Sequence, residues 1–164
     1  MQLPVFIQIV LSCQNNPMNI PYEKPPYVFQ RDLRKQLISY LEKELEANSR
    51  ELSKNLLERK IRFLQRSSVR WISDFGKFAL AFTEMYYQES DLENFSAESK
   101  AIMKVGLQYL IDIYDVIPDV VQDKGYLDDY HMLHLCLKRI SLMDSDSLGG
   151  YFLMEKGSVI DVNL

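Results

Sequence analysis

The sequence predicts an all-α protein: a compact bundle of four or five helices with an extended Pro-rich N-terminal arm and a short C-terminal tail. Leucines recur every four residues after Gln30, which is the period of one helix face. Proline is concentrated before residue 27, so few helix breakers remain in the body of the chain. The length of 164 residues suits one domain with a real core.

The first two stripes, each a row of apolar residues at helical spacing, lie on either side of a predicted break. One stripe runs from Leu33 to Leu45 and the next from Leu52 to Leu64. Asn48, with Glu51 three residues later, resembles a helix cap and its reciprocal partner. We therefore expect a break or kink near residues 47–49, and whether the region forms one helix or two stays open.

Three further stripes complete the bundle. The stripe from Val69 to Tyr86 is apolar on two faces, which predicts a helix central to the core with Phe75 and Phe82 buried. Ser96 is placed to cap the next helix, whose apolar positions run over residues 102–114. The last main helix is predicted over residues 127–140.

These elements divide the chain into an arm over residues 1–28, a helical domain over 29–143 and a tail over 144–164. The first thirteen residues are apolar but contain no Arg or Lys, which disfavours a signal peptide, and they are too short to span a bilayer. The two cysteines, Cys13 and Cys136, form no close pair. This spacing favours a reducing compartment, so we expect a cytoplasmic protein.

A motif rich in aspartate lies between the last two predicted helices. The motif begins at the end of a predicted helix, at Tyr109–Leu110. A turn centred on proline follows, with Asp115, Ile117, Pro118 and Asp119. The motif ends with a glycine and an aspartate pair, at Gly125, Leu127, Asp128 and Asp129. This pattern resembles the hallmark of the YkvA-like bacterial domain family, over roughly residues 96–142. The family's first Pro is replaced by Ile113, and its apolar loop is polar here at 122–124. The resemblance implies a small helical domain with a tight corner, and it implies no activity.

Three interpretations of the aspartates compete. In the leading one they are structural: Asp128 and Asp129 meet the free N–H groups of a new helix, and Asp115 and Asp119 close the turn around Pro118, with Gly125 supplying the corner. In the second they bind a metal, for which the candidates are Asp115, Asp119, Asp128, His131 and His134. In the third they are catalytic, but no nucleophile pattern, phosphate loop or cofactor fingerprint accompanies them. We expect no metal and no cofactor.

The chain carries a second candidate feature, a stripe of arginines. Arg59, Arg62, Arg66 and Arg70 recur every three or four residues and are predicted to share an exposed side. The net charge is +5 over residues 1–70 and −9 over 71–164, so the two halves are able to complement one another within the fold or across a homodimer. The acidic pI of 5.2 disfavours nucleic acid as a partner.

From these features we expect a non-enzymatic accessory or interaction module that binds a protein partner. Two alternatives stay open. One is a metal-dependent enzyme that uses the Asp115–Asp129 corner, and the other is a membrane-peripheral protein that binds anionic lipid through the arginine stripe.

Overall fold

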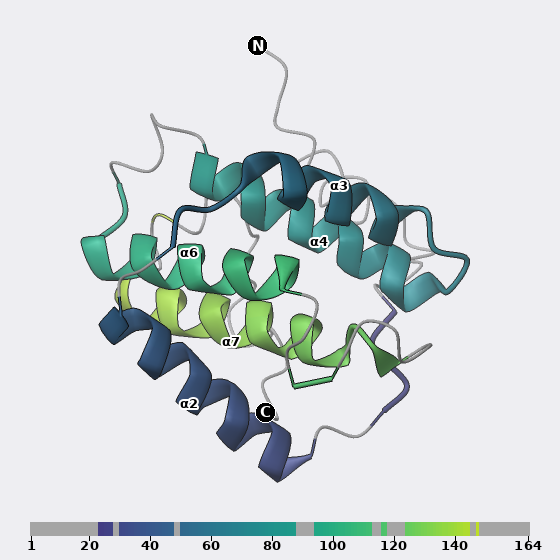
Figure 1. Cartoon of the computed structure of the whole chain (residues 1–164), viewed down its shortest axis with the longest axis horizontal. Coiled ribbons are helices and arrows are strands. Elements are labelled where there is room, and N and C mark those ends of the chain that lie inside the picture. The colour runs from purple at the N-terminus through teal and green to yellow at the C-terminus, as the bar shows by residue number, and fades with distance from the viewer. Residues whose placement is uncertain are drawn as a thin grey trace.

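The structure is a computed structural model that describes residues 23–27, 30–47, 50–87, 94–112, 116–117, 124–144 and 147. Within these residues the protein is an all-α bundle of five helices, and the predicted fold class is confirmed (Figure 1). The helices are α2 (Arg31–Ala47), α3 (Lys54–Gln65), α4 (Arg70–Tyr87), α6 (Ala97–Ile111) and α7 (Leu127–Met143). None of these described helices combines the length and the hydropathy that a membrane span requires.

The structure answers the question left open about the first stripes: they form two helices. α2 ends at Ala47, and α3 begins after Ser53, whose hydroxyl accepts a hydrogen bond from the Leu56 N–H at 3.4 Å. Ser53 is thus the N-cap of α3. The predicted cap Asn48 lies outside the described residues.

α3 and α4 form an antiparallel pair. The Lys54 ammonium at the start of α3 lies 5.1 Å from the Tyr87 ring at the end of α4. At the other end, the Ser73 hydroxyl donates to the Gln65 carbonyl at 3.1 Å. Gly76 allows this close approach, because a Cβ there would lie 2.7 Å from the Gln65 nitrogen.

α6 and α7 form a second antiparallel pair, fastened at both ends. Asp144, just after α7, accepts hydrogen bonds from the Ser96 N–H at 3.2 Å, the Ser96 hydroxyl at 2.8 Å and the Ser99 hydroxyl. These bonds hold the pKa of Asp144 below its usual range. At the opposite end, Tyr109 of α6 meets Asp128 of α7. Ser96 also caps α6 as predicted, since its hydroxyl accepts from the Ser99 N–H at 3.1 Å.

α6 occupies the centre of the bundle. It contacts each of the other four described helices, with α3 and α4 on one side and α2 and α7 on the other (Figure 1). The sequence assigned the central position to α4, whose Phe75 and Phe82 are indeed buried at 1% and 0% exposure. α4 buries more of its residues than α6, yet α6 packs against all four of the other described helices, and its Gly106 lets α7 approach closely.

The chain on either side of the bundle is described only in part. Residues 1–22 and 148–164, which include Cys13, lie outside the description. Glu23, the first described residue, donates its N–H to Asp74 of α4 at 3.1 Å, so this end of the predicted arm is held on the bundle. Cys136 is a free thiol buried in α7, and burial raises its pKa to about 12.

Gly106 sets the spacing between α6 and α7, which leads to a first prediction. Ala normally stabilises a helix interior over Gly by about 1 kcal/mol. Here the added Cβ would lie 2.9 Å from the Cys136 Sγ and 3.2 Å from a Leu133 methyl carbon. We expect Gly106→Ala to lower the free energy of unfolding by about 1–3 kcal/mol through overpacking.

The matched control is the double variant Gly106→Ala with Cys136→Ala, which removes the sulfur atom. Urea unfolding of the two single variants and the double variant forms a cycle. We expect the double variant to be more stable than the sum of the single effects. Strict additivity would mean that the Gly106–Cys136 contact does not limit the spacing.

Candidate functional site

The structure describes only part of the predicted aspartate corner. Asp115, Pro118 and Asp119 lie outside the described residues, whereas Gly125, Asp128 and Asp129 are described and buried. The helix ahead of the corner ends at Ile111, with Asp112 as its C-cap, and the helix after it begins at Leu127.

Asp128 joins the two sides of the corner. Its side chain is fully buried, and one carboxylate oxygen accepts hydrogen bonds from the Tyr109 hydroxyl at 2.6 Å and from the Ile117 N–H at 2.9 Å. The Tyr109 hydroxyl in turn accepts from the Val116 N–H at 3.2 Å. Two N–H groups of the short described segment 116–117 are therefore bound by side chains of α6 and α7.

The electrostatics of Asp128 reflect two opposing effects. Burial raises its pKa, because a carboxylate loses its hydration inside the bundle. Hydrogen bonds from Tyr109, from Ile117 and from the N–H groups of Asp128 and Asp129 themselves act in the opposite direction. The predicted capping role therefore describes only part of the arrangement. The hydrogen bonds to its side chain come from Tyr109 of α6 and from Ile117 in the corner, and Tyr126 at the N-cap of α7 has no side-chain cap.

The neighbouring acidic and imidazole groups are enclosed as well. Asp129 is 1% exposed and His131 is 7% exposed. The His134 ring stacks between Phe78 and Tyr130, with centroids 4.4 and 4.1 Å apart, and its Nδ1 lies 2.7 Å from the Tyr130 carbonyl oxygen. A neutral ring that donates from Nδ1 satisfies this contact. Burial lowers the pKa of His131 to about 3 and that of His134 to about 4.

The metal candidates that the structure describes are not assembled into a ligand set. Among the described residues no three His, Cys, Asp or Glu side chains are grouped so as to hold an ion. His134 uses Nδ1 on a backbone carbonyl, and Asp128 uses one oxygen on Tyr109 and Ile117. Asp115 and Asp119, the other two candidates, are outside the description.

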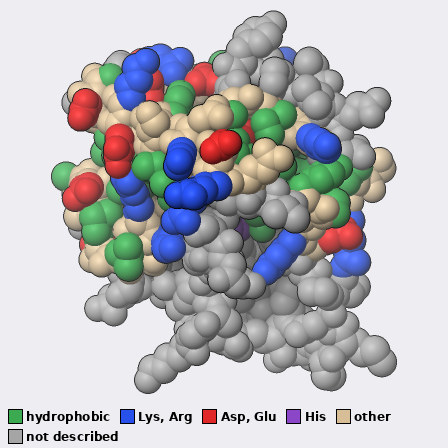
Figure 2. All heavy atoms as spheres, turned by 90° about the horizontal axis from the view of Figure 1, so that it is seen from below, with side chains coloured by type: hydrophobic (Ala, Val, Ile, Leu, Met, Phe, Trp, Pro, Cys, Tyr) green, Lys and Arg blue, Asp and Glu red, His purple; other side chains and the backbone are tan. Residues whose placement is uncertain are grey.

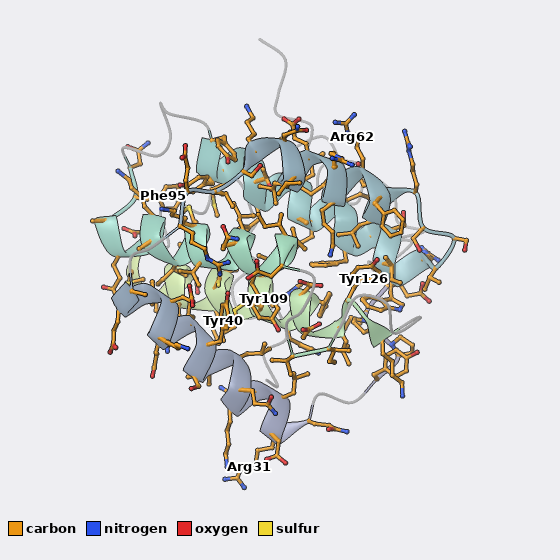
Figure 3. The ribbon with its side chains drawn as sticks, in the orientation of Figure 1. Arg31, Tyr40, Arg62, Phe95, Tyr109 and Tyr126 are labelled. Carbon is orange, nitrogen blue, oxygen red and sulfur yellow. The ribbon has the colours of Figure 1, made fainter. Side chains whose placement is uncertain are left out.

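A second polar cluster was not anticipated from the sequence. Asp112, the C-cap of α6, accepts hydrogen bonds from the Tyr40 hydroxyl of α2 at 3.1 Å and from Arg50 at 3.2 Å. The Tyr40 ring meets the Tyr109 ring edge-on with centroids 4.9 Å apart, and the two side chains lie together at the centre of Figure 3. The sequence shows only that Asp112 lies near the end of a predicted helix. Its partners Tyr40 and Arg50 lie more than sixty positions away, so no local pattern links them to it.

The four predicted arginines are exposed, as expected, but they do not all lie on one helix. Arg59 and Arg62 lie on α3 and Arg66 is its C-cap, whereas Arg70 begins α4, where its Nε lies 3.9 Å from Asp74. Figure 3 shows Arg62 pointing away from the bundle beyond α3. The structure therefore brings three of the four arginines together.

These three arginines line a hollow of about 630 Å³ between α3, the end of α6 and the start of α7. The other lining residues are a lysine and four apolar or aromatic side chains, from α3, the end of α6 and the start of α7: Lys60, Leu56, Phe63, Ile111 and Tyr126. Phe63 is 63% exposed and Leu56 is 50% exposed. Sequence analysis missed these residues, although Leu56 and Phe63, seven positions apart on one helix face, were a usable signal.

The face of the molecule that is seen from below offers a contrast. On the side seen from below, where α2 lies, Lys and Arg side chains are mixed with Asp and Glu (Figure 2). α2 itself alternates acidic and basic residues along its sequence. The hollow combines basic and apolar groups, and none of its described lining residues carries a carboxylate. It is the candidate functional site.

No family model matches the chain, and no curated protein or solved structure is similar to it. The resemblance to the YkvA-like family therefore stays a prediction.

The Asp128 network leads to a second prediction. Asp128→Ala removes the acceptor for Tyr109 and Ile117, and an unpaired buried group costs about 1–3 kcal/mol. Asp128→Asn keeps one acceptor oxygen and removes the cost of a buried charge, so we expect it to cost less than about 1 kcal/mol. Urea unfolding of both variants measures the difference.

Added Ca²⁺, Mg²⁺, Mn²⁺ or Zn²⁺ separates this role from ion binding. If the corner is structural, thermal unfolding of the wild type and of Asp128→Asn responds equally to each ion. Strong stabilisation of the wild type alone by one ion would identify a metal site at Asp128 instead.

The buried histidines lead to a third prediction. Their pKa values of about 3 and about 4 in the folded chain lie below the usual 6.5, so protons bind the unfolded chain preferentially. Stability contributed by neutral His131 and His134 is fully present above pH 6.5 and is lost as the pH falls toward 4. The slope is at most about 1.4 kcal/mol per pH unit for each histidine. Asp128 acts in the opposite direction, because its pKa is raised.

Urea unfolding between pH 7 and pH 4.5 measures this slope. We expect His131→Gln and His134→Gln each to flatten it, while the exposed variant Lys43→Gln keeps the wild-type slope. An unchanged slope in both histidine variants would assign the acid sensitivity to other groups.

Proposed function

We propose that this protein is a non-enzymatic interaction module and that its contact surface is the hollow on α3. The observation that carries the proposal is the exposure of Phe63 and Leu56 beside Arg59, Arg62 and Arg66. Large aromatic side chains with Arg around them are the groups that contribute most to protein–protein binding energy. An exposed apolar pair within a basic hollow costs solubility, so a covering partner is its simplest explanation.

The accessibility of the two candidate sites favours binding over catalysis. Asp128, Asp129 and His131 have 0–7% of their surface exposed, so a substrate would reach them only if α6 and α7 separated. Phe63 and the arginines around it are open to solvent without any rearrangement. A metal-dependent enzyme based on the corner is therefore the weaker alternative.

A second candidate function is binding to an anionic membrane surface, for a cytoplasmic and membrane-peripheral protein. It is supported by Arg59 and Arg66, whose guanidinium groups form no ion pair in the part of the chain that is described. A free buried thiol at Cys136 accords with a reducing cytoplasm. Membership of the YkvA-like family and homodimer formation remain part of the proposal.

A fourth prediction tests the contact surface itself. Phe63→Asp places a charge where the apolar group is exposed, so it should leave the fold intact and abolish retention of the protein's partner from its native cells. The matched control is Leu142→Asp, because Leu142 is 79% exposed near the end of α7. Mass spectrometry of proteins co-purified with wild type, Phe63→Asp and Leu142→Asp compares the three.

We expect one set of proteins to be retained by the wild type and by Leu142→Asp and to be lost with Phe63→Asp. Equal thermal unfolding midpoints for the two variants control for folding. Partners lost equally from both variants, or from neither, would remove α3 as the contact surface.

A further inference from the structure

The cations of the hollow are arranged to receive a negatively charged ligand. Among the described residues that line the hollow, four are basic and none is acidic, while the neighbouring residues 113–115 and 118–123 lie outside the described part of the chain. Arg59 and Arg66 have no ion-pair partner within the described residues. Arg62 lies 3.9 Å from Glu58 on its own helix, a distance at the limit of an ion pair between exposed groups and worth little. The guanidinium groups are thus available, and guanidinium binds carboxylates through two parallel hydrogen bonds.

The apolar part of the hollow is arranged to receive one large side chain. Leu56, Lys60 and Phe63 follow the i, i+4, i+7 spacing of one helix face, so the strip is about 10 Å long at a rise of 1.5 Å per residue. The Phe63 and Tyr126 rings are tilted against one another with centroids 6.4 Å apart. Ile111, the last residue of α6, is the remaining apolar lining residue.

The geometry points to one class of ligand. We propose that the hollow binds an acidic segment of a partner protein, which places one large apolar side chain against Phe63 and Tyr126 and its Asp or Glu side chains against Arg59, Arg62 and Arg66. This inference rests on the proposed function, and it specifies the chemistry of the partner at the same surface.

Two other polyanions fit the hollow less well. Nucleic-acid bases stack on open aromatic faces. Here the Lys60 ammonium lies over the Tyr126 ring, 5.0 Å from its centroid, and the planes of the Phe63 and Tyr126 rings differ by 58°, so the two rings offer no common stacking face. A bilayer presents a broad charged plane, which would meet the whole chain with its net charge of −4 and not the hollow alone. A short acidic segment enters a concave site and avoids the acidic remainder of the surface.

The test uses fluorescein-labelled peptides of twelve residues and fluorescence anisotropy with the full chain. A panel carries Asp and Glu throughout, with a single Phe or Leu moved through the central positions. One control panel replaces the acidic residues with Asn and Gln, and another replaces the apolar residue with Ser. Phosphatidylcholine vesicles with 30% phosphatidylserine and a labelled twelve-nucleotide oligo-uridine serve as the competing ligands.

Two variants and two matched controls locate the binding site. The single variant Phe63→Ser is compared with Leu142→Ser. The double variant that carries Arg59→Gln and Arg66→Gln is compared with a control double variant on α2, which carries Arg31→Gln and Lys43→Gln. All of these positions are exposed, so circular dichroism should be the same for each protein.

We expect at least one acidic peptide with an apolar residue to bind about tenfold more tightly than its two control peptides, which corresponds to about 1.4 kcal/mol. Phe63→Ser and the Arg59–Arg66 variant should each weaken it about tenfold, while the matched controls stay within about twofold. Raising NaCl from 50 to 300 mM should weaken binding further, because exposed charges are screened.

Several results would overturn the inference. One is an acidic peptide that binds equally well when its apolar residue is replaced. The same conclusion follows if the peptide binds the Phe63→Ser variant as tightly as the wild type. Another is tighter binding of the vesicles or of oligo-uridine than of every peptide. If no peptide binds but Phe63→Asp still loses its cellular partner, the acidic-segment inference fails and the proposed function stands. If Phe63→Asp also keeps that partner, both fail.

Discussion

The hydrogen bond between Tyr109 and Asp128 is the constraint on which the rest of the structure depends. It joins the centre of the bundle to the last helix through two side chains that are both fully buried. The Tyr109 ring packs against Tyr40 of α2, and its hydroxyl binds the corner at Val116. One side chain of α6 therefore contacts α2, α7 and the connection between α6 and α7. Because Tyr109 and Asp128 are enclosed, a partner that either side chain loses is not replaced by water without opening the bundle.

This network also lies next to the candidate contact surface. The hollow takes Ile111 from the end of α6 and Tyr126 from the residue before α7, and these two residues flank the corner that Asp128 and Tyr109 close. Asp128 follows Tyr126 by two residues, and the Tyr126 ring lies beside Phe63 of α3. The described end of the aspartate motif therefore lies next to one wall of the hollow. A binding surface built on fixed helix ends loses less conformational entropy when a ligand arrives.

The sequence predicted the helices well and the surface only in part, for a definite geometric reason. Apolar periodicity depends on each helix alone, so the stripes of α2, α4 and the last helices were visible, and so was Ser96 as a cap. The spacing of the arginines predicts a shared face only for residues that lie on the same continuous helix. α3 ends at Gln65 and the chain turns back, which separates Arg70 from Arg59 and Arg62. Ile111 and Tyr126 join the hollow from other helices, and no local pattern encodes such a meeting.

The charge distribution bears on the ligand that we propose for the hollow. At physiological ionic strength exposed charges act over roughly 8 Å. A long polyanion that approaches the hollow also meets the acidic remainder of a chain whose net charge is −4. A short acidic segment meets only Arg59, Arg62, Arg66 and Lys60, all of which lie within one hollow. The apolar groups add a second requirement, because burying Phe63 and Leu56 rewards only a ligand with a matching apolar side chain. In the binding proposed above, short-range charge and an apolar contact at the same place would together select a small, acidic and amphipathic ligand over larger anions.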